Sequence, residues 1–260
     1  MKESDTSQIN INFTLKLNSF EMLKYLNIGF FVVMIIMNYL ANALPLNNKT
    51  TGALSDALPN LFVPAGLTFS IWGIIYLLLA AFCIIQFKGS DQVIIEKTGW
   101  LFSISCLLNA VWIVAWHYQR IPVSLLIMTG LLITLIYINM VIRPLPFGII
   151  KAAFGIYLGW ICIALIANVT ALFVRYSWDG FGISEVAWTM IMISAGVLIV
   201  SLALLKLQNP FIGISVIWAF LGIYIKRQDD FRTIAITAIV ALFVMAIITL
   251  LGFFRKKIGI

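Results

Sequence analysis

Charged residues and metal-binding side chains are scarce in this sequence. Only 10% of its 260 residues are charged, and His117 is its single histidine. Every Asp, Glu, Lys and Arg lies in a connector or at the end of an apolar run, and none lies inside one. An ionisable residue within a membrane usually marks an ion path or a proton relay. Its absence argues against a proton-coupled carrier with a buried carboxylate and against a voltage sensor.

The motifs of common enzymes and metal sites are also missing. No His-Glu-x-x-His, Gly-x-Ser-x-Gly or Gly-rich loop ending in Lys-Ser/Thr occurs. Cys83, Cys106 and Cys162 stand singly in apolar runs, a spacing that fits neither a zinc site nor a disulfide framework. His117 ends an apolar run beside Arg120, which favours an interfacial position over a role as an axial haem ligand. We therefore predict no metal site, no catalytic residue and no required cofactor, and an enzyme is the less favoured class.

Hydrophobic residues make up 62% of the chain, and the mean hydropathy is +1.06. A helix needs about 20 apolar residues to span the hydrocarbon core of a bilayer. Eight runs approach or meet this length: Tyr25–Leu44, Pro64–Phe87, Trp100–His117, Val123–Ile142, Ala152–Val174, Val186–Leu205, Pro210–Ile225 and Thr233–Phe254. The seventh run is the weak one, which suits a helix that is tilted, half-inserted or sheltered by neighbours. The sequence thus predicts an all-α, polytopic helical bundle in a lipid bilayer, without a large soluble domain.

The basic residues predict how the bundle is oriented. The formal net charge is +7, but Lys and Arg are spread over short connectors and form no basic stripe for nucleic acid. With eight spans both termini share one side, and that side collects eleven of the 17 Lys and Arg residues. Because cytoplasmic loops carry the excess of positive charge, we expect a bacterial cell-membrane protein with both termini, including an N-terminal segment 1–24, in the cytoplasm. The connector Pro45–Leu61 would lie outside, where it can cover a cavity mouth.

Aromatic and asparagine side chains recur at helical intervals inside three of the runs. Residues three, four or seven positions apart share one face of a helix. The three faces carry Phe69, Trp72 and Tyr76; Asn109, Trp112 and Trp116; and Tyr157, Trp160, Ala164 and Asn168. Such side chains are also common in interfacial belts and in helix packing, and that alternative stays open for each residue. Since Trp72, Trp112 and Trp160 lie well inside their runs, the three faces indicate a cavity.

These segments resemble motifs of the TspO/MBR family, which includes the bacterial tryptophan-rich sensory proteins and the mitochondrial translocator protein. The second run is similar to the family's second helix in the order Pro64, Phe69, Trp72 and Tyr76. The third and fifth runs are similar to its later motifs in Leu108-Asn109-x-x-Trp112 and in Tyr157-Leu158-Gly159-Trp160-x-x-x-Ala164-x-x-x-Asn168. The resemblance covers 25–175 and implies a five-helix bundle, leaving 176–260 as an additional C-terminal region of about three membrane helices.

The resemblance implies that the three faces enclose a pocket for a flat hydrophobic ligand, such as a porphyrin, haem or another tetrapyrrole. Aromatic faces stack on a planar ring, asparagine amides bond its polar edge, and the small Ala164 leaves room for it. The approach Leu61-Phe62-Val63-Pro64 departs from the Trp-rich, double-proline approach of the family. The order Arg175-Tyr176 also fails to give the Tyr-then-basic order of a sterol motif, so we predict no sterol binding.

Three classes of function stay open. The leading one is a membrane receptor or sensor that binds a tetrapyrrole and regulates or moves it. The alternative is an uncoupled small-molecule transporter or a membrane subunit of a transport system, and the third is a tetrapyrrole-degrading enzyme. The last three spans and the segment before them carry Trp178, Trp188 and Trp218 without a second aromatic stripe. They can pack the bundle, form a homodimer surface or serve a separate function.

Overall fold

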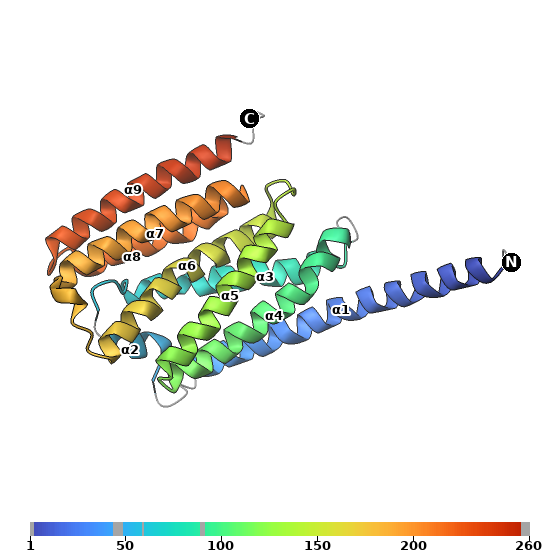
Figure 1. Cartoon of the computed structure of the whole chain (residues 1–260), viewed down its shortest axis with the longest axis horizontal. Coiled ribbons are helices and arrows are strands. Elements are labelled where there is room, and N and C mark those ends of the chain that lie inside the picture. Colours follow the sequence, from blue (N-terminus) through green and yellow to red (C-terminus); the bar gives the residue numbers. More distant parts are fainter. Residues whose placement is uncertain (1–2, 44–48, 59, 89–91, 256–260) are drawn as a thin grey trace.

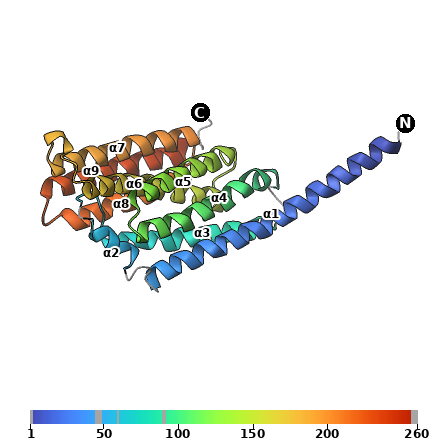
Figure 2. The same cartoon turned by 60° about the horizontal axis from the view of Figure 1, so that its bottom comes forward.

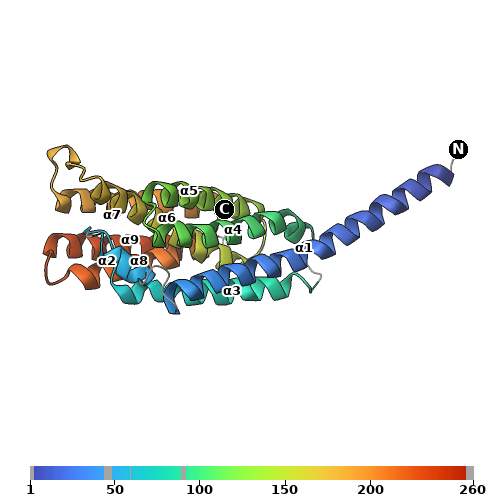
Figure 3. The same cartoon turned by 90° about the horizontal axis from the view of Figure 1, so that it is seen from below.

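The computed structural model describes residues 3–43, 49–58, 60–88 and 92–255. Over these ranges all regular structure is helical, which confirms the predicted all-α class (Figure 1). The α-helices are α1 (Glu3–Ala43), α2 (Thr51–Asp56), α3 (Ile71–Ile85), α4 (Gln92–His117), α5 (Ile121–Val141), α6 (Ile149–Arg175), α7 (Glu185–Leu207), α8 (Phe211–Arg227) and α9 (Arg232–Arg255). Two 3-10 helices, η2 (Gly66–Ser70) and η3 (Gly180–Gly182), precede α3 and α7. The first part of α1 extends beyond the bundle (Figure 3).

Seven helical segments of the described chain are long and apolar enough to cross a bilayer. The eighth predicted span corresponds to α8, whose 17 residues rise only about 25 Å, less than the roughly 30 Å of hydrocarbon core. Its neighbours α6, α7 and α9 shelter it, and Ile212, Val216 and Phe220 are fully buried. The bundle therefore has seven full-length spans and one shorter, sheltered helix.

Helix α8 nevertheless extends from one end of the bundle to the other. Next to its start, the Lys151 Nζ atom donates to the Gln208 carbonyl at 3.0 Å, and Asn209 Nδ2 donates to the Lys151 carbonyl at 2.9 Å. At its far end, Arg227 Nε donates to the Leu61 carbonyl at 3.0 Å. The chain thus changes direction at every helix from α3 to α9. Which face is cytoplasmic stays a prediction.

Helix α6 lies at the centre of the bundle and positions both halves. Helices α7 and α8 pack on one side of it, with α9 packed against those two, whereas α3 and α5 contact its other side (Figures 1 and 2). At Gly159 a Cβ atom would clash with the Ile212 carbonyl and the Ser215 side chain of α8. A small residue here lets the two helices approach closely. The division of the chain at Arg175 stays a prediction, but its two parts share this tight contact.

The core between α3, α4 and α6 is aromatic. Phe82 lies edge to face against Phe102 and Phe154, with ring centroids 5.0 Å apart in both pairs. All three side chains are fully buried. This cluster fixes the relative rotation of the three helices, and the same rotation brings the aromatic faces of the sequence toward one another.

Candidate functional site

The three predicted aromatic faces meet at a cavity between α3, α4 and α6. Seven of the ten predicted ligand-binding residues line it: Phe69, Trp72, Trp112, Trp116, Trp160, Ala164 and Asn168. The remaining lining residues are Thr51, Ser55, Asn60, Val63, Pro64, Ile163, Ala167 and Ala171. Its free volume is only about 50 Å³, which leaves room for no more than a few water molecules. We call this space the aromatic cavity.

The rings that line the aromatic cavity pack against one another. Trp72 meets Trp160 edge to face, with centroids 6.2 Å apart and planes at 83°. Phe69 meets Trp160 in the same way at 5.9 Å, and Trp112 stacks on Trp116 at 6.1 Å and 22°. Aromatic pairs of this kind contribute about 0.5–1.5 kcal/mol each beyond the burial of their area. The ring pairs themselves therefore favour the narrow form of the cavity.

Four polar groups around the aromatic cavity have no hydrogen-bond partner within the described part of the chain. They are the indole Nε1 atoms of Trp112, Trp116 and Trp160 and the hydroxyl of Thr51, all buried. Leaving a buried donor unpaired costs about 1–3 kcal/mol, and native proteins contain few such groups. Four donors around one cavity would stabilise a ligand that presents hydrogen-bond acceptors to them.

The other three predicted site residues, Tyr76, Asn109 and Tyr157, do not line the aromatic cavity. Asn109 Nδ2 donates to the Tyr157 hydroxyl at 2.9 Å, and its Oδ1 accepts from Asn38 Nδ2 at 2.8 Å. This amide therefore joins α1, α4 and α6. Asn168 does line the cavity, although its Oδ1 accepts from the Ser124 hydroxyl at 2.7 Å. The amides make the helix-packing bonds that the sequence left as an alternative, and their contact with a ligand stays a prediction.

A groove of about 350 Å³ lies beside the aromatic cavity, against α1, α3 and α4. Tyr76 lines this groove together with Asn38 and Asn42. Thr51, Phe69 and Trp72 line both spaces, so the Phe69 and Trp72 rings form part of the wall between them. Even without the aromatic cavity, the groove has the volume of a usual small-molecule site, about 300–1,000 Å³.

The connector before α3 covers one end of the aromatic cavity. Residues 50–58 and 60–63 of this connector, which we call the lid, contain helix α2. Thr50 caps this helix, because its hydroxyl accepts from the Ala53 N–H at 3.2 Å. Thr51, Ser55 and Asn60 of the lid line the cavity. The sequence predicts that the connector Pro45–Leu61 can cover a cavity mouth. Residues 44–48 lie outside the described ranges.

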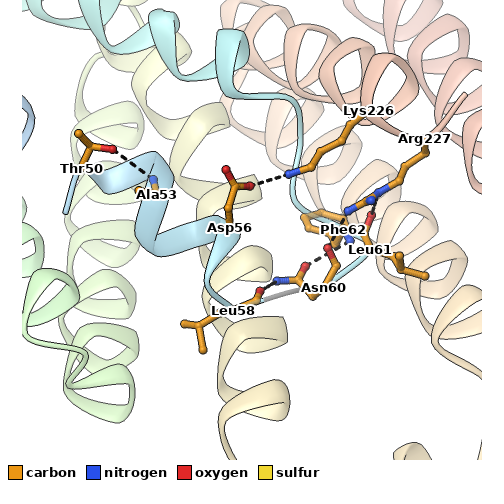
Figure 4. A network of polar contacts seen from close by, with 9 residues as sticks. All are labelled: Thr50, Ala53, Asp56, Leu58, Asn60, Leu61, Phe62, Lys226 and Arg227. Carbon is orange, nitrogen blue, oxygen red and sulfur yellow. Dashed lines mark hydrogen bonds and ion pairs between the residues drawn. The ribbon is translucent and has the colours of Figure 1, made fainter. Parts of the chain in front are cut away.

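Two cations at the end of α8 hold the lid in place (Figure 4). Lys226 Nζ lies 2.9 Å from Asp56 Oδ1 of α2. Arg227 donates to the carbonyls of Asn60 and Leu61 at 2.8 and 3.0 Å. In the sequence alone, Lys226 and Arg227 contribute only to the charge distribution. The contacts of these two residues with the lid could not be predicted, because no sequence pattern relates segments so far apart.

Side chains that commonly bind metal ions are dispersed in the described part of the chain. Within the described ranges no three His, Cys, Asp or Glu side chains are grouped so that they could hold a metal ion. His117 is fully buried at the end of α4, where Nδ1 lies 2.8 Å from the Ile113 carbonyl and Nε2 lies 3.2 Å from the Ala41 carbonyl. The imidazole thus ties α4 to the end of α1.

Comparison with known proteins adds one finding. A family model described as TSPO-like protein matches residues 24–251. No curated protein and no solved structure matches the chain. The matched range runs through α7, α8 and α9, so the similarity extends past the five-helix region at 25–175.

Proposed function

Because the chain belongs to the TSPO-like protein family, we propose that it is a membrane receptor for a planar hydrophobic ligand that binds in the aromatic cavity. The chain is an integral membrane protein, and its family membership confirms the resemblance found in its motifs. The aromatic lining and the indole donors of the cavity favour a porphyrin or another tetrapyrrole as the ligand class. The observation that carries this proposal is the convergence of three unpaired indole N–H groups on one aromatic space.

The chemistry of a porphyrin matches this space in two ways. Its flat conjugated ring offers faces on which the indoles of Trp72 and Trp160 would stack. These contacts would replace the contact that the two indoles make with each other. Its edge carries carboxylate oxygens, which accept hydrogen bonds from donors such as Trp112 Nε1 and Trp160 Nε1. A bond to a charged acceptor is worth about 1.5–3 kcal/mol, and it would relieve the cost of the unpaired donors. The site holds the ligand without burying a charged side chain.

Binding of so large a ring requires the aromatic cavity to open. Its volume of about 50 Å³ is far below that of a usual small-molecule site, but the adjoining groove of about 350 Å³ supplies the missing space. Trp72 stands between them, so rotation of its ring would admit a planar ligand. The ligand would then lie between α1, α3, α4 and α6, beneath the lid.

Titration of the purified full-length protein with protoporphyrin tests the proposal. We expect the porphyrin to quench tryptophan fluorescence, and an alkyl porphyrin without carboxylates to bind more weakly because it lacks acceptors for the indole donors. Replacing Trp160→Leu should weaken protoporphyrin binding about fivefold or more, since a stacking face is lost. Trp100→Leu is the matched control, because Trp100 is 56% exposed and lines neither space. Equal affinity of the two variants would remove the aromatic cavity from consideration.

A further inference from the structure

We propose that a second cavity, separate from the aromatic cavity, binds an organic cation carrying a substituted ammonium group. This cavity lies between the lid, the end of α6 and the start of α7, and its volume is about 410 Å³. It therefore falls within the range of small-molecule sites without any rearrangement. Of its described lining residues only Asn60 also lines the aromatic cavity. We call it the ammonium cavity.

Four aromatic residues line the ammonium cavity, Phe62, Phe173, Trp178 and Trp188. Trp178 lies between Phe173 and Trp188, with centroid distances of 4.2 and 5.1 Å. The planes of the two indoles meet at 55°, so the rings form two sides of a corner instead of a flat stack. Both indoles are half-buried and line the cavity. Tryptophan faces attract cations more strongly than other rings do, and several faces around one space recognise quaternary ammonium groups.

The charge of the lining has a single sign. Asp179 and Glu185 are its only charged residues among those that the structure describes, in a chain whose net charge is +7. Asp179 Oδ1 accepts from the Phe181 N–H at 3.1 Å, which turns this carboxylate toward the loop that carries Trp178. Two carboxylates beside aromatic faces attract a cation and repel an anion. The ammonium cavity thus favours a cation, whereas the hydrogen-bond donors around the aromatic cavity favour a ligand with acceptors.

The backbone around Trp178 is held in an unusual form. Ser177 and Phe181 have φ values of 49° and 53°, in the left-handed region that residues other than glycine rarely occupy. Each such residue costs about 1–3 kcal/mol and persists only where its surroundings enforce it. Here Trp188 Nε1 donates to the Gly180 carbonyl at 2.8 Å and fixes the loop against α7. The strained loop keeps the aromatic corner open in a fixed shape.

Two sources can supply the ammonium group, a free amine or the headgroup of a phospholipid. The apolar side chains of Tyr176, Phe181 and Ile183 are exposed beside the cavity, at 66%, 79% and 42%. Exposed aromatic residues at the end of membrane helices lie at headgroup level. The ammonium cavity is therefore within reach of both sources, and an experiment can separate them.

The test uses purified full-length protein in a nonionic maltoside detergent, titrated by calorimetry with four probes. Choline is compared with 3,3-dimethyl-1-butanol, which has the same shape without the charge. Dihexanoyl phosphatidylcholine is compared with dihexanoyl phosphatidylglycerol. We expect Trp178→Leu to weaken binding of the cationic probe about two- to thirtyfold through loss of the cation–π contact. Glu185→Gln should weaken binding of the cationic probe as well. Because the Glu185 side chain is exposed, this substitution should leave the fold intact.

The outcomes divide as follows. Binding of choline but not of its neutral analogue supports a free amine, whereas binding of phosphatidylcholine alone supports a lipid headgroup. In either case Trp100→Leu and Trp160→Leu should leave the affinity unchanged, so this proposal can fail or succeed independently of the proposed function. Absence of binding by both cationic probes, equal binding of choline and its neutral analogue, or unchanged affinity in Trp178→Leu and Glu185→Gln would overturn it.

Discussion

Lys226 Nζ lies 2.9 Å from Asp56 Oδ1, although 170 positions separate the two residues in the sequence. The pair joins the last turn of α8 to α2 of the lid. The Asp56 side chain is 67% exposed and that of Lys226 is 27% exposed, so the pair contributes only about 0–1 kcal/mol to folding. The ion pair therefore mainly fixes the position of the lid over the aromatic cavity. It is weak enough to break, so the lid can open.

Replacing Lys226→Gln should therefore speed ligand association more than it changes stability. The lid would lose its ion pair while Arg227 still holds the carbonyls of Asn60 and Leu61. We expect a shift of only a few degrees in the unfolding temperature and a faster rise of porphyrin quenching in stopped-flow measurements. Lys206→Gln removes the same charge from the other end of the bundle and serves as control. Identical association rates for the two variants would exclude a gating role for the lid.

The width of the aromatic cavity can be set at one position. Ala164 lines it beside Trp160 on α6 and is only half-buried, so a larger side chain there would enter the free space. Ala164→Phe should abolish porphyrin binding, and Ala164→Ser should leave it nearly unchanged. Fluorescence titration of both variants, with unfolding temperatures measured in parallel, checks this. Full affinity in a folded Ala164→Phe protein would place the ligand elsewhere.

Trp72 forms part of the wall between the aromatic cavity and the groove, and removal of its ring should join them. Trp72→Leu is expected to raise the association rate of the porphyrin and to raise its dissociation rate as well, because one stacking face is lost. Trp100→Leu makes the same replacement at a residue that lines neither space and is the matched control. If Trp72→Leu lowered the association rate, the ring would guide the ligand instead of separating the two spaces.

The contact between α6 and α8 predicts a large difference between two glycines. Gly159→Ala would push a methyl group into the Ile212 carbonyl, whereas Gly73→Ala on α3 meets nothing within 4 Å. We expect a loss of about 1–3 kcal/mol for Gly159→Ala and almost none for Gly73→Ala. Thermal unfolding in detergent measures both. Equal unfolding temperatures would show that α8 can move away from α6 at little cost.

The orientation of the bundle needs a direct measurement. A cysteine introduced as Thr50→Cys should react with a membrane-impermeant reagent in intact cells, because the charge distribution predicts that the lid lies outside. Protection of this cysteine until the cells are opened would reverse the orientation. Cys83, Cys106 and Cys162 are buried and should give little background.

The aromatic faces could be predicted because the helical period alone decides which residues share a face. The period placed Trp72, Trp112 and Trp160 on their faces, and helix packing brings the three to one cavity. The roles of the amides could not be predicted in the same way, since the partner of Asn109 is Asn38, 71 positions earlier on another helix. A buried amide bonds whichever neighbour the packing brings to it, and periodicity carries no information on that neighbour.

Features built from tertiary contacts were likewise absent from the sequence interpretation. The run from Pro210 is short for a membrane span, and its length alone made it a weak candidate. The structure shows that this helix, α8, packs closely on α6 at Gly159, a contact that its length does not indicate. Trp178 and Trp188 showed no stripe, since one lies in a connector and the other at the start of α7. Their corner depends on the left-handed turn around Gly180, which a lone sequence does not specify.

Helix α8 gives the molecule a mechanical link across the membrane. Its start is tied to Lys151 in α6, at the end of the bundle opposite the lid, and its end is tied to the lid through Lys226 and Arg227. A helix of 17 residues behaves as a stiff rod of about 25 Å, so a displacement at one end is felt at the other. A ligand that lifts the lid would thereby pull on the connector at the far face. In the proposed receptor, binding in the aromatic cavity would thus be transmitted from one end of the bundle to the other.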